Sequence, residues 1–276
     1  MDESIVGGFI AILIVLTSNK GFKDFMFFDR NSLHVDAVLK GREYRRLISA
    51  NFLHCNWFHV AFNVIALLSF SKFLEAAISP GALLITYVAS MFGGDLLSLY
   101  VHRNHGDYRA VGASGAISGV VIASVLLNPF GEIGFLMLPV HISAWIFGVV
   151  FMLVSILGIK RQSDNIGHEA HLGGALIGAL IVLLYRPEII HQHPWVVMGI
   201  MLPSILFIAL IIRNPTVLLL DNYWGEKPAV LTKKVPISVT PEEELDALLA
   251  KIKKKGIKGL TNKERRRLKE LREGMK

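Results

Sequence analysis

Two stretches of this sequence share one pattern. Residues 112–119 read GASGAISG, and residues 168–178 read HEAHLGGALIG. Each stretch carries two glycines four residues apart, namely Gly115 with Gly119 and Gly174 with Gly178. Glycines at this spacing let the backbones of two membrane helices come into contact. The pattern therefore predicts that both stretches are helices and that they pack against each other inside a membrane.

The composition also indicates a membrane protein. Of the 276 residues, 53% are hydrophobic and only 18% are charged, and the mean hydropathy is +0.50. A water-soluble domain carries more charge than this. Seven segments have the length and the low charge of helices that cross a bilayer: residues 5–17, 58–78, 80–102, 112–128, 134–159, 168–186 and 194–212. The expected fold class is an all-α polytopic membrane protein.

Charge divides the chain into a neutral part and a basic C-terminal part. Residues 1–212 hold 13 Lys and Arg against 13 Asp and Glu, whereas residues 213–276 hold 16 against 9. We expect the following domains: a core over 1–186, a further spanning helix over 187–212, a linker over 213–239 and a small basic helical hairpin over 240–276. Each hairpin helix would begin at a capping box. The hairpin can contact anionic lipid headgroups or act as a solvated adaptor, and both roles stay open.

The first loop, residues 19–57, is long for a connection between membrane helices. It mixes apolar and charged residues closely, as in the run Phe22, Lys23, Asp24, Phe25. This mixture suits a segment that lies in the membrane interface, and an ordinary aqueous loop is the alternative.

Polar side chains inside spanning helices are costly, so each one is a candidate for function. The candidates are His59, Asn63, Asp95, Ser114, Ser118, His141, His168, Glu169 and His171. His59 and Asn63 are four residues apart and share one helix face. Both can donate hydrogen bonds, which an oxyanion-binding site requires. Bonding between neighbouring helices is the alternative role for this pair.

Ser114 and His171 stand beside the two glycine steps. Ser114 directly precedes Gly115, and His171 lies three residues before Gly174. Packing of the two glycine faces would bring the serine hydroxyl beside the imidazole. A hydroxyl next to an imidazole is the arrangement of a nucleophile and its general base. The two motifs together therefore predict a catalytic pair.

Three motifs in this order resemble the rhomboid family of intramembrane serine proteases: HCNWFHVAFN at 54–63, GASGAISG at 112–119 and HEAHLGG at 168–174. The resemblance covers roughly residues 1–186 and implies a six-helix core, to which residues 194–212 would add a seventh helix. The basic tail is similar to a short C-terminal extension of some bacterial members. A bacterial inner membrane is the location that this implies.

The resemblance implies a role for each matching residue. Ser114 matches the nucleophile and His171 the general base. His59 and Asn63 match the side chains that hold the oxyanion together with the backbone N–H of Ser114. Gly112 matches the glycine beside which substrate approaches, and the four glycines of the two steps, Gly115, Gly119, Gly174 and Gly178, are packing residues.

The activity implied is endoproteolysis of transmembrane segments of membrane proteins through an acyl-enzyme. The implied surroundings are the lipid bilayer, and no cofactor, metal or nucleic acid is expected. We expect a Ser–His dyad, because Glu169 points away from His171 on a helix and no sequence argument brings Asp95 to it. His54 is expected to form structural hydrogen bonds in the loop.

Two positions depart from the family pattern. Members usually carry Trp-Arg in the first loop, where this chain has Arg45-Arg46. Many members have an aromatic residue four positions after the serine, packed on the catalytic imidazole, where this chain has Ser118. The placement of the loop and the orientation of His171 therefore depend on other contacts.

Other function classes fit less well. A zinc peptidase would need HExxH, and the run from His168 to His171 is one residue short of it. A transporter often shows an inverted repeat, and no such repeat relates the halves of this chain. A catalytically weak or inactive relative that acts as a membrane chaperone stays the alternative, although both Ser114 and His171 are present. The single cysteine, Cys55, makes no internal disulfide.

Two arguments about orientation disagree. The resemblance places the first loop and the mouth of the site outside the cytoplasm. Basic residues gather in that loop and in the C-terminal tail, and the positive-inside rule favours the cytoplasm for both.

Overall fold

The computed structural model describes residues 4–135, 138–161 and 166–218, and six further positions in the C-terminal region. The chain divides into two units, Met1–Leu220 and Asp221–Lys276. The sequence instead suggests boundaries at 186, 212 and 239. These divisions stay predictions, because most residues after 218 lie outside the described part of the chain.

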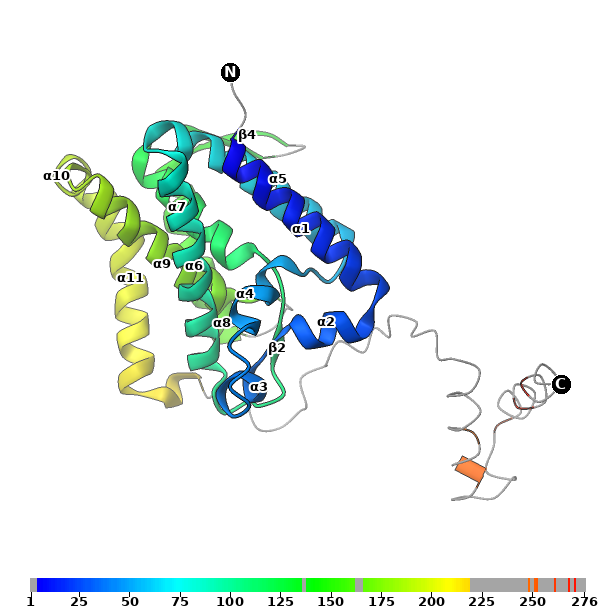
Figure 1. The fold of residues 1–276 in the computed structure, drawn as a ribbon. Helices are drawn as coiled ribbons and strands as arrows, with labels where there is room; N and C mark the ends of the chain where they lie inside the picture. Colours follow the sequence, from blue (N-terminus) through cyan, green and yellow to red (C-terminus); the bar gives the residue numbers. More distant parts are fainter. Residues whose placement is uncertain are drawn as a thin grey trace. The chain divides into compact units, whose positions relative to one another are not determined.

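The first unit is a bundle of apolar helices (Figure 1). Among the described residues, six helices are long and apolar enough to cross a membrane. They are α1 (Ile5–Lys23), α5 (Trp57–Ala77), α6 (Pro80–Val101), α8 (Ala144–Arg161), α9 (His168–Tyr185) and α11 (Pro194–Arg213). The shorter α7 (Ser114–Leu127) lies among them, and α10 (Glu188–Gln192) joins α9 to α11. The predicted polytopic helical fold is confirmed.

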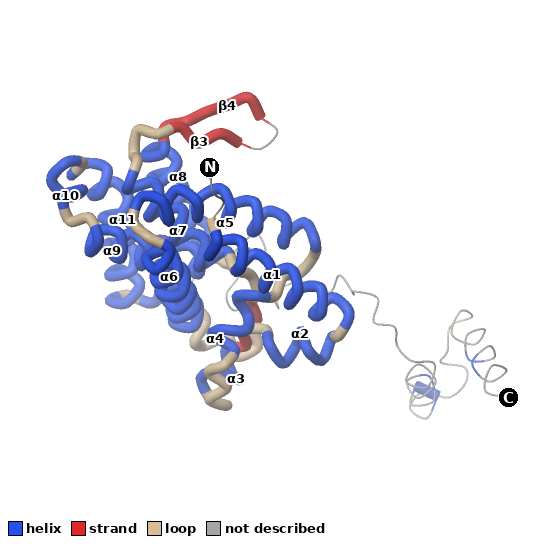
Figure 2. The backbone as a smooth tube through the Cα atoms, turned by 45° about the horizontal axis from the view of Figure 1, so that its top comes forward, coloured by secondary structure: helices blue, strands red, loops and turns tan. Residues whose placement is uncertain are grey.

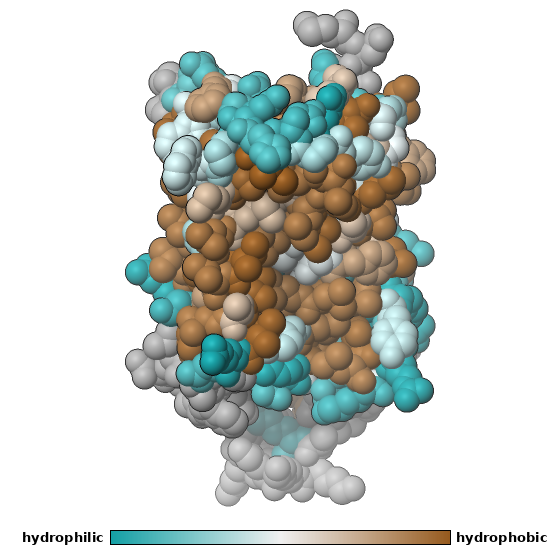
Figure 3. All heavy atoms as spheres, turned by 90° about the vertical axis from the view of Figure 1, so that its left-hand side faces the viewer, coloured by the Kyte–Doolittle hydropathy of each residue, from teal (hydrophilic) through white to brown (hydrophobic). Residues whose placement is uncertain are grey.

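The outer surface of the bundle is apolar. Figure 3 shows a broad hydrophobic band with hydrophilic groups gathered above and below it. On α11, the exposed side chains include Met198, Leu202, Leu206 and Leu210. Large apolar side chains that face outward are stable in lipid and unstable in water, so the first unit is a multi-pass membrane protein.

Helix α7 is the centre of the first unit. It packs against α5, α6 and α9, and each of its residues from 115 to 126 is buried. The small residues Gly115, Ala116 and Gly119 leave room for this close packing. Because other helices surround α7, its 14 residues do not have to match the thickness of the lipid.

The first loop is folded. It contains α2 (Phe25–Asn31), β1 (Leu33–His34), α3 (Val35–Leu39), α4 (Arg46–Ser49) and η1 (Ala50–Phe52). Strand β1 pairs antiparallel with β2 (Arg109–Ala110), which links this loop to the segment before α7. No residue of α2 is buried, and Phe25 and Met26 are more than half exposed.

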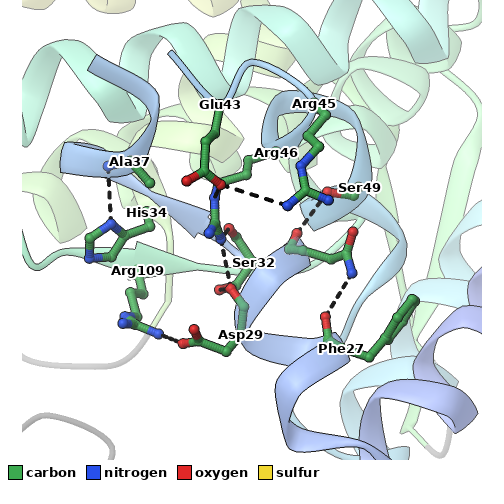
Figure 4. A network of polar contacts seen from close by, with 11 residues as sticks. Phe27, Asp29, Ser32, His34, Ala37, Glu43, Arg45, Arg46, Ser49 and Arg109 are labelled. Atoms are coloured by element: carbon green, nitrogen blue, oxygen red, sulfur yellow. Dashed lines mark hydrogen bonds and ion pairs between the residues drawn. The ribbon is translucent and has the colours of Figure 1, made fainter. Parts of the chain in front are cut away.

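Arg46 holds the first loop together (Figure 4). Its side chain is buried and donates through Nε to Glu43 at 2.8 Å and through Nη1 to the carbonyls of Asp29 at 2.6 Å and Ser32 at 2.8 Å. The hydrogen bond from Arg46 to Glu43 holds the pKa of the Glu43 carboxyl below its ordinary value. Arg45 and Arg46 stand where family members usually carry Trp-Arg. Arg46 stabilises the first loop, whereas Arg45 is exposed and its guanidinium lies 3.7 Å from the carboxylate of Glu43.

One predicted helix boundary is wrong. The apolar run 134–159 begins as a hairpin of β3 (Glu132–Phe135) and β4 (Leu138–Ser143), and α8 starts only at Ala144. The hairpin stands out from the helices in Figure 2. Pro139 has no backbone N–H and opposes helix in its neighbourhood, which a hydropathy average does not register. Helix α1 also runs further than its predicted end at residue 17.

In the second unit, Leu248 and Leu271 are buried, with Ile252 and Leu268 packed against them. These four residues come from the two predicted helices of the 240–276 hairpin. The hairpin itself lies mostly outside the described residues and stays a prediction.

Candidate active site

The two glycine steps of the sequence lie against each other, where α7 meets α9. A Cβ atom added to Gly174 would overlap the carbonyl of Gly115, and one added to Gly178 would overlap the backbone of Gly119. A Cβ on Gly115 would lie 3.2 Å from the carbonyl oxygen of Ala170. Only glycine allows backbones to approach this closely.

Ser114 and His171 flank this contact. Ser114 is the first residue of α7 and directly precedes Gly115, and His171 directly follows Ala170 in the first turns of α9. The helix starts that carry the two side chains are therefore held together by backbone contact. Both residues are partly exposed.

Gly112 lies close to His59 and Ser114. Its φ of +134° is a conformation that side-chain-bearing residues rarely adopt. A Cβ at this position would lie 2.9 Å from Cε1 of His59 and 3.8 Å from Oγ of Ser114. The absence of a side chain at Gly112 therefore lets the imidazole of His59 lie close to the backbone beside Ser114.

Hydrogen bonds to the chain before α5 support the segment that leads to Ser114. The backbone N–H of Gly112 donates to the carbonyl of Ala50 at 3.0 Å, and that of Ala113 donates to Nε2 of His54 at 3.3 Å. With Nε2 as acceptor, His54 donates from Nδ1 to Oγ of Ser18 at 3.0 Å, and Ser18 donates to Phe52. Burial, helped by His59, lowers the pKa of His54 to about 3, so the ring stays neutral. The expected structural role of His54 is confirmed.

Asn63 lies one turn after His59 on α5. Its side chain is buried, and Nδ2 donates to the backbone carbonyl of His59 at 2.9 Å. The side-chain amide carries a second N–H. The N-cap Asn56 begins this helix by accepting from the backbone N–H of His59 at 2.8 Å.

An aromatic ring packs beside His171, and it comes from α8. The centroids of Phe151 and His171 are 6.0 Å apart with an interplanar angle of 28°. The residue four positions after the serine, Ser118, is buried and donates to the carbonyl of Ser114 at 2.6 Å. Sequence reasoning missed Phe151, because no sequence spacing relates α8 to α9.

The two carboxylates considered as third members of a triad bond elsewhere. Glu169 accepts from the hydroxyl of Tyr108 and from Nε2 of His102, and Asp95 accepts from Nδ2 of Asn51 at 2.8 Å. Sequence reasoning also missed His102 and Tyr108. The available signal was the polar run HRNHGDYR, residues 102–109, directly before the serine motif.

Within the described ranges, no three His, Cys, Asp or Glu side chains are grouped as metal ligands would be. The candidate site therefore consists of a serine, a histidine and hydrogen-bond donors. Such a set can bind a carbonyl group and transfer a proton.

Comparison with known proteins agrees with the arrangement of the three motifs. A family model described as the Rhomboid domain matches residues 41–188, and a second, described as a family of unknown function (DUF6576), matches residues 239–273. The chain is 26% identical over 193 residues to "RHOMBOID-like protein 12, mitochondrial" of Arabidopsis thaliana, which covers 64% of this chain and 57% of that protein. It is 32% identical over 168 residues to "Rhomboid protease AarA" of Providencia stuartii, covering 53% and 57%.

The chain is also 28% identical over 137 residues to "Rhomboid protein 1, mitochondrial" of Saccharomyces cerevisiae, covering 49% of this chain and 40% of that protein. It thus spans between 40% and 57% of the length of these three relatives. The Rhomboid match covers more than half of the chain and includes both glycine steps and every candidate residue of the site. This multi-pass membrane protein therefore belongs to the rhomboid family.

Proposed function

We propose that this rhomboid is an intramembrane serine endopeptidase in which Ser114 is the nucleophile and His171 the general base. The observation that carries the proposal is the backbone contact between α7 and α9, because Ser114 and His171 flank it. The close approach of His59 to Gly112, beside Oγ of Ser114, supports it further. A relative, "Rhomboid protease AarA", is named as a protease.

In the proposed reaction, Oγ of Ser114 attacks the carbonyl carbon of a peptide bond while His171 takes the hydroxyl proton. The carbonyl oxygen becomes an oxyanion beside Gly112, where His59, the second N–H of Asn63 and the backbone N–H of Ser114 donate to it. His171 then gives the proton to the leaving nitrogen, and an acyl-enzyme forms. Water attacks the ester carbonyl and gives a proton to His171, which passes it to Oγ of Ser114 as the ester bond breaks and the product acid leaves.

The proposed substrates are membrane proteins with a transmembrane segment. A backbone carbonyl inside a helix is hydrogen-bonded, so a substrate helix must unwind locally before Ser114 can reach it. Segments that are unstable near the bilayer surface are therefore the preferred substrates. The bilayer proposed is the bacterial inner membrane, which the relative from Providencia stuartii supports, although two of the relatives above are mitochondrial.

Labelling by a fluorophosphonate probe and cleavage of a panel of spanning segments test the proposal. Ser114→Ala and His171→Ala should abolish both readouts, and Asn63→Ala should lower the cleavage rate about 100-fold to 1000-fold. Ser124→Ala is the matched control, since Ser124 is a buried serine on the same helix that donates to Val120. It should keep the wild-type rate.

Turnover by purified Ser114→Ala would refute the assignment. A wild-type chain that binds spanning segments but takes no probe would be a binding protein of the chaperone kind. Chelators should leave the rate unchanged.

A further inference from the structure

A buried carboxylate joins the start of α9 to the segment that leads to Ser114. Glu169 is 5% exposed and lies two residues before His171. It accepts hydrogen bonds from the hydroxyl of Tyr108 and, at 3.2 Å, from Nε2 of His102. Both donors belong to the connection between α6 and α7, which ends at Ser114.

The two donors form one unit. The rings of His102 and Tyr108 are stacked, with centroids 3.5 Å apart and an interplanar angle of 7°. Burial, together with the charge of Glu169, raises the pKa of the Tyr108 phenol well above its ordinary value, so the hydroxyl keeps the proton that it donates. We call Glu169, His102 and Tyr108 the loop clamp.

The loop clamp and the hydrogen bonds that follow it restrain residues 109–113. Directly after Tyr108, strand β2 pairs with β1, and the N–H groups of Gly112 and Ala113 donate to Ala50 and His54. These bonds attach the connection to the first loop, whereas the loop clamp attaches it to α9, the helix that carries His171. A carboxylate buried without donors is costly, so Glu169 favours the arrangement in which both donors stay in place.

We propose that Glu169, Tyr108 and His102 are positioning residues that set the placement of Ser114 relative to His171. This inference rests on the proposed function. Glu169 is not a third member of a triad, because its bonds lead to the serine-bearing segment and not to the imidazole of His171. The loop clamp acts on the geometry of the pair and touches no reacting atom.

The experiment measures the rate at which a fluorophosphonate probe labels Ser114 in the full chain in detergent micelles. All rates are taken at a temperature below the unfolding transition of every variant. Tyr108→Phe removes one hydroxyl and keeps the stacked ring, and Tyr87→Phe makes the same change at a buried tyrosine of α6 whose hydroxyl has no partner among the described residues. Tyr108→Phe should slow labelling about 10-fold, and Tyr87→Phe should keep the wild-type rate.

Glu169→Gln and Glu169→Leu form the second comparison. Glutamine keeps an acceptor oxygen for Tyr108, so Glu169→Gln should retain more of the labelling rate than Glu169→Leu. With a cleavable substrate, we expect kcat to fall and KM to stay unchanged, because the proposed role of the loop clamp is to place Ser114 relative to His171. Amide hydrogen exchange at residues 110–113 should be faster in Tyr108→Phe.

A purely structural role predicts a different result. Variants that lower the unfolding temperature yet label at the wild-type rate would overturn the inference and leave the proposed function intact. Equal effects of Tyr108→Phe and Tyr87→Phe would overturn it as well. A wild-type chain that takes no label would overturn both.

Discussion

The ring of Phe151 gives the first prediction at the scale of single residues. It packs beside the imidazole of His171. Many family members pack an aromatic residue on this imidazole from the position four residues after the serine, where this chain has Ser118. An aromatic contact of this kind contributes about 0.5–1.5 kcal/mol, so Phe151→Leu should lower kcat by about 2-fold to 10-fold. Steady-state cleavage measures the effect.

The control for this prediction is Phe9→Leu. Phe9 lies on α1 with 62% of its surface exposed, so the same chemical change there should leave kcat at the wild-type value. If Phe151→Leu raised kcat, the ring would obstruct the site and would not support His171.

His54 makes the stability of the protein depend on pH. Its pKa is about 3 in the folded chain, because the ring is buried, and about 6.5 in the unfolded chain. Below pH 6.5 the unfolded chain takes up a proton that the folded chain does not, so stability falls as the pH falls toward 3. The unfolding temperature should therefore drop more between pH 7 and pH 5 in the wild type than in His54→Gln. Equal slopes would contradict the role of His54.

At the scale of elements, the contact between α7 and α9 depends on glycine. A Cβ on Gly178 would overlap the backbone of Gly119, which cannot move aside as a side chain can. We expect Gly178→Ala to destabilise the fold by about 2–3 kcal/mol. Unfolding in micelles measures this, with Gly81→Ala as the control, since the nearest atom to a Cβ there is 3.9 Å away. If Gly178→Ala left the free energy of unfolding unchanged, the close contact between α7 and α9 would not contribute to stability.

The first loop depends on one guanidinium. Arg46 is buried and donates to Glu43 and to two carbonyls, so Arg46→Gln should loosen α2 to α4 and cost about 2–3 kcal/mol locally. Hydrogen exchange should rise over residues 25–49 and stay unchanged in α7. The neighbouring variant Arg45→Gln should leave hydrogen exchange unchanged both over residues 25–49 and in α7, because Arg45 is exposed. A similar response to both variants would contradict this account.

The elements and the site differ in how well the sequence predicts them. The spanning helices are predictable because hydropathy directly reports burial in lipid, and the glycine contact is predictable because the spacing of Gly115, Gly119, Gly174 and Gly178 encodes it. The start of α8 is not predictable from hydropathy, since an apolar strand and an apolar helix have similar hydropathy over ten residues. Phe151 and Tyr108 reach the site only through tertiary contacts, which leave no periodicity in the sequence.

At the scale of the whole molecule, we expect an odd number of membrane crossings between the two ends of the first unit, six from its long apolar helices and one from α7. Successive crossings alternate in direction. We therefore expect the connection after α6 and the end of α11 to lie on one side of the membrane and the β3–β4 hairpin on the other. In a Cys55→Ser background, Asn104→Cys and Arg213→Cys should react with an impermeant maleimide from the same side, and Glu132→Cys only from the opposite side. All three positions are exposed.

If Arg213→Cys reacted with the maleimide from the same side as Glu132→Cys, α11 would not cross the membrane. The side on which Asn104→Cys reacts in intact cells also decides between the family orientation and the one that the basic residues favour.

The burial of α7 has a consequence for how the protein is made. This helix leaves the ribosome some forty residues ahead of α9, so the surface of α7 that packs against α9 has no partner while the intervening chain is still being synthesised. A nascent protein at that stage carries the serine without the histidine. The proposed Ser–His pair therefore cannot form until α9 has been synthesised and has packed against α7.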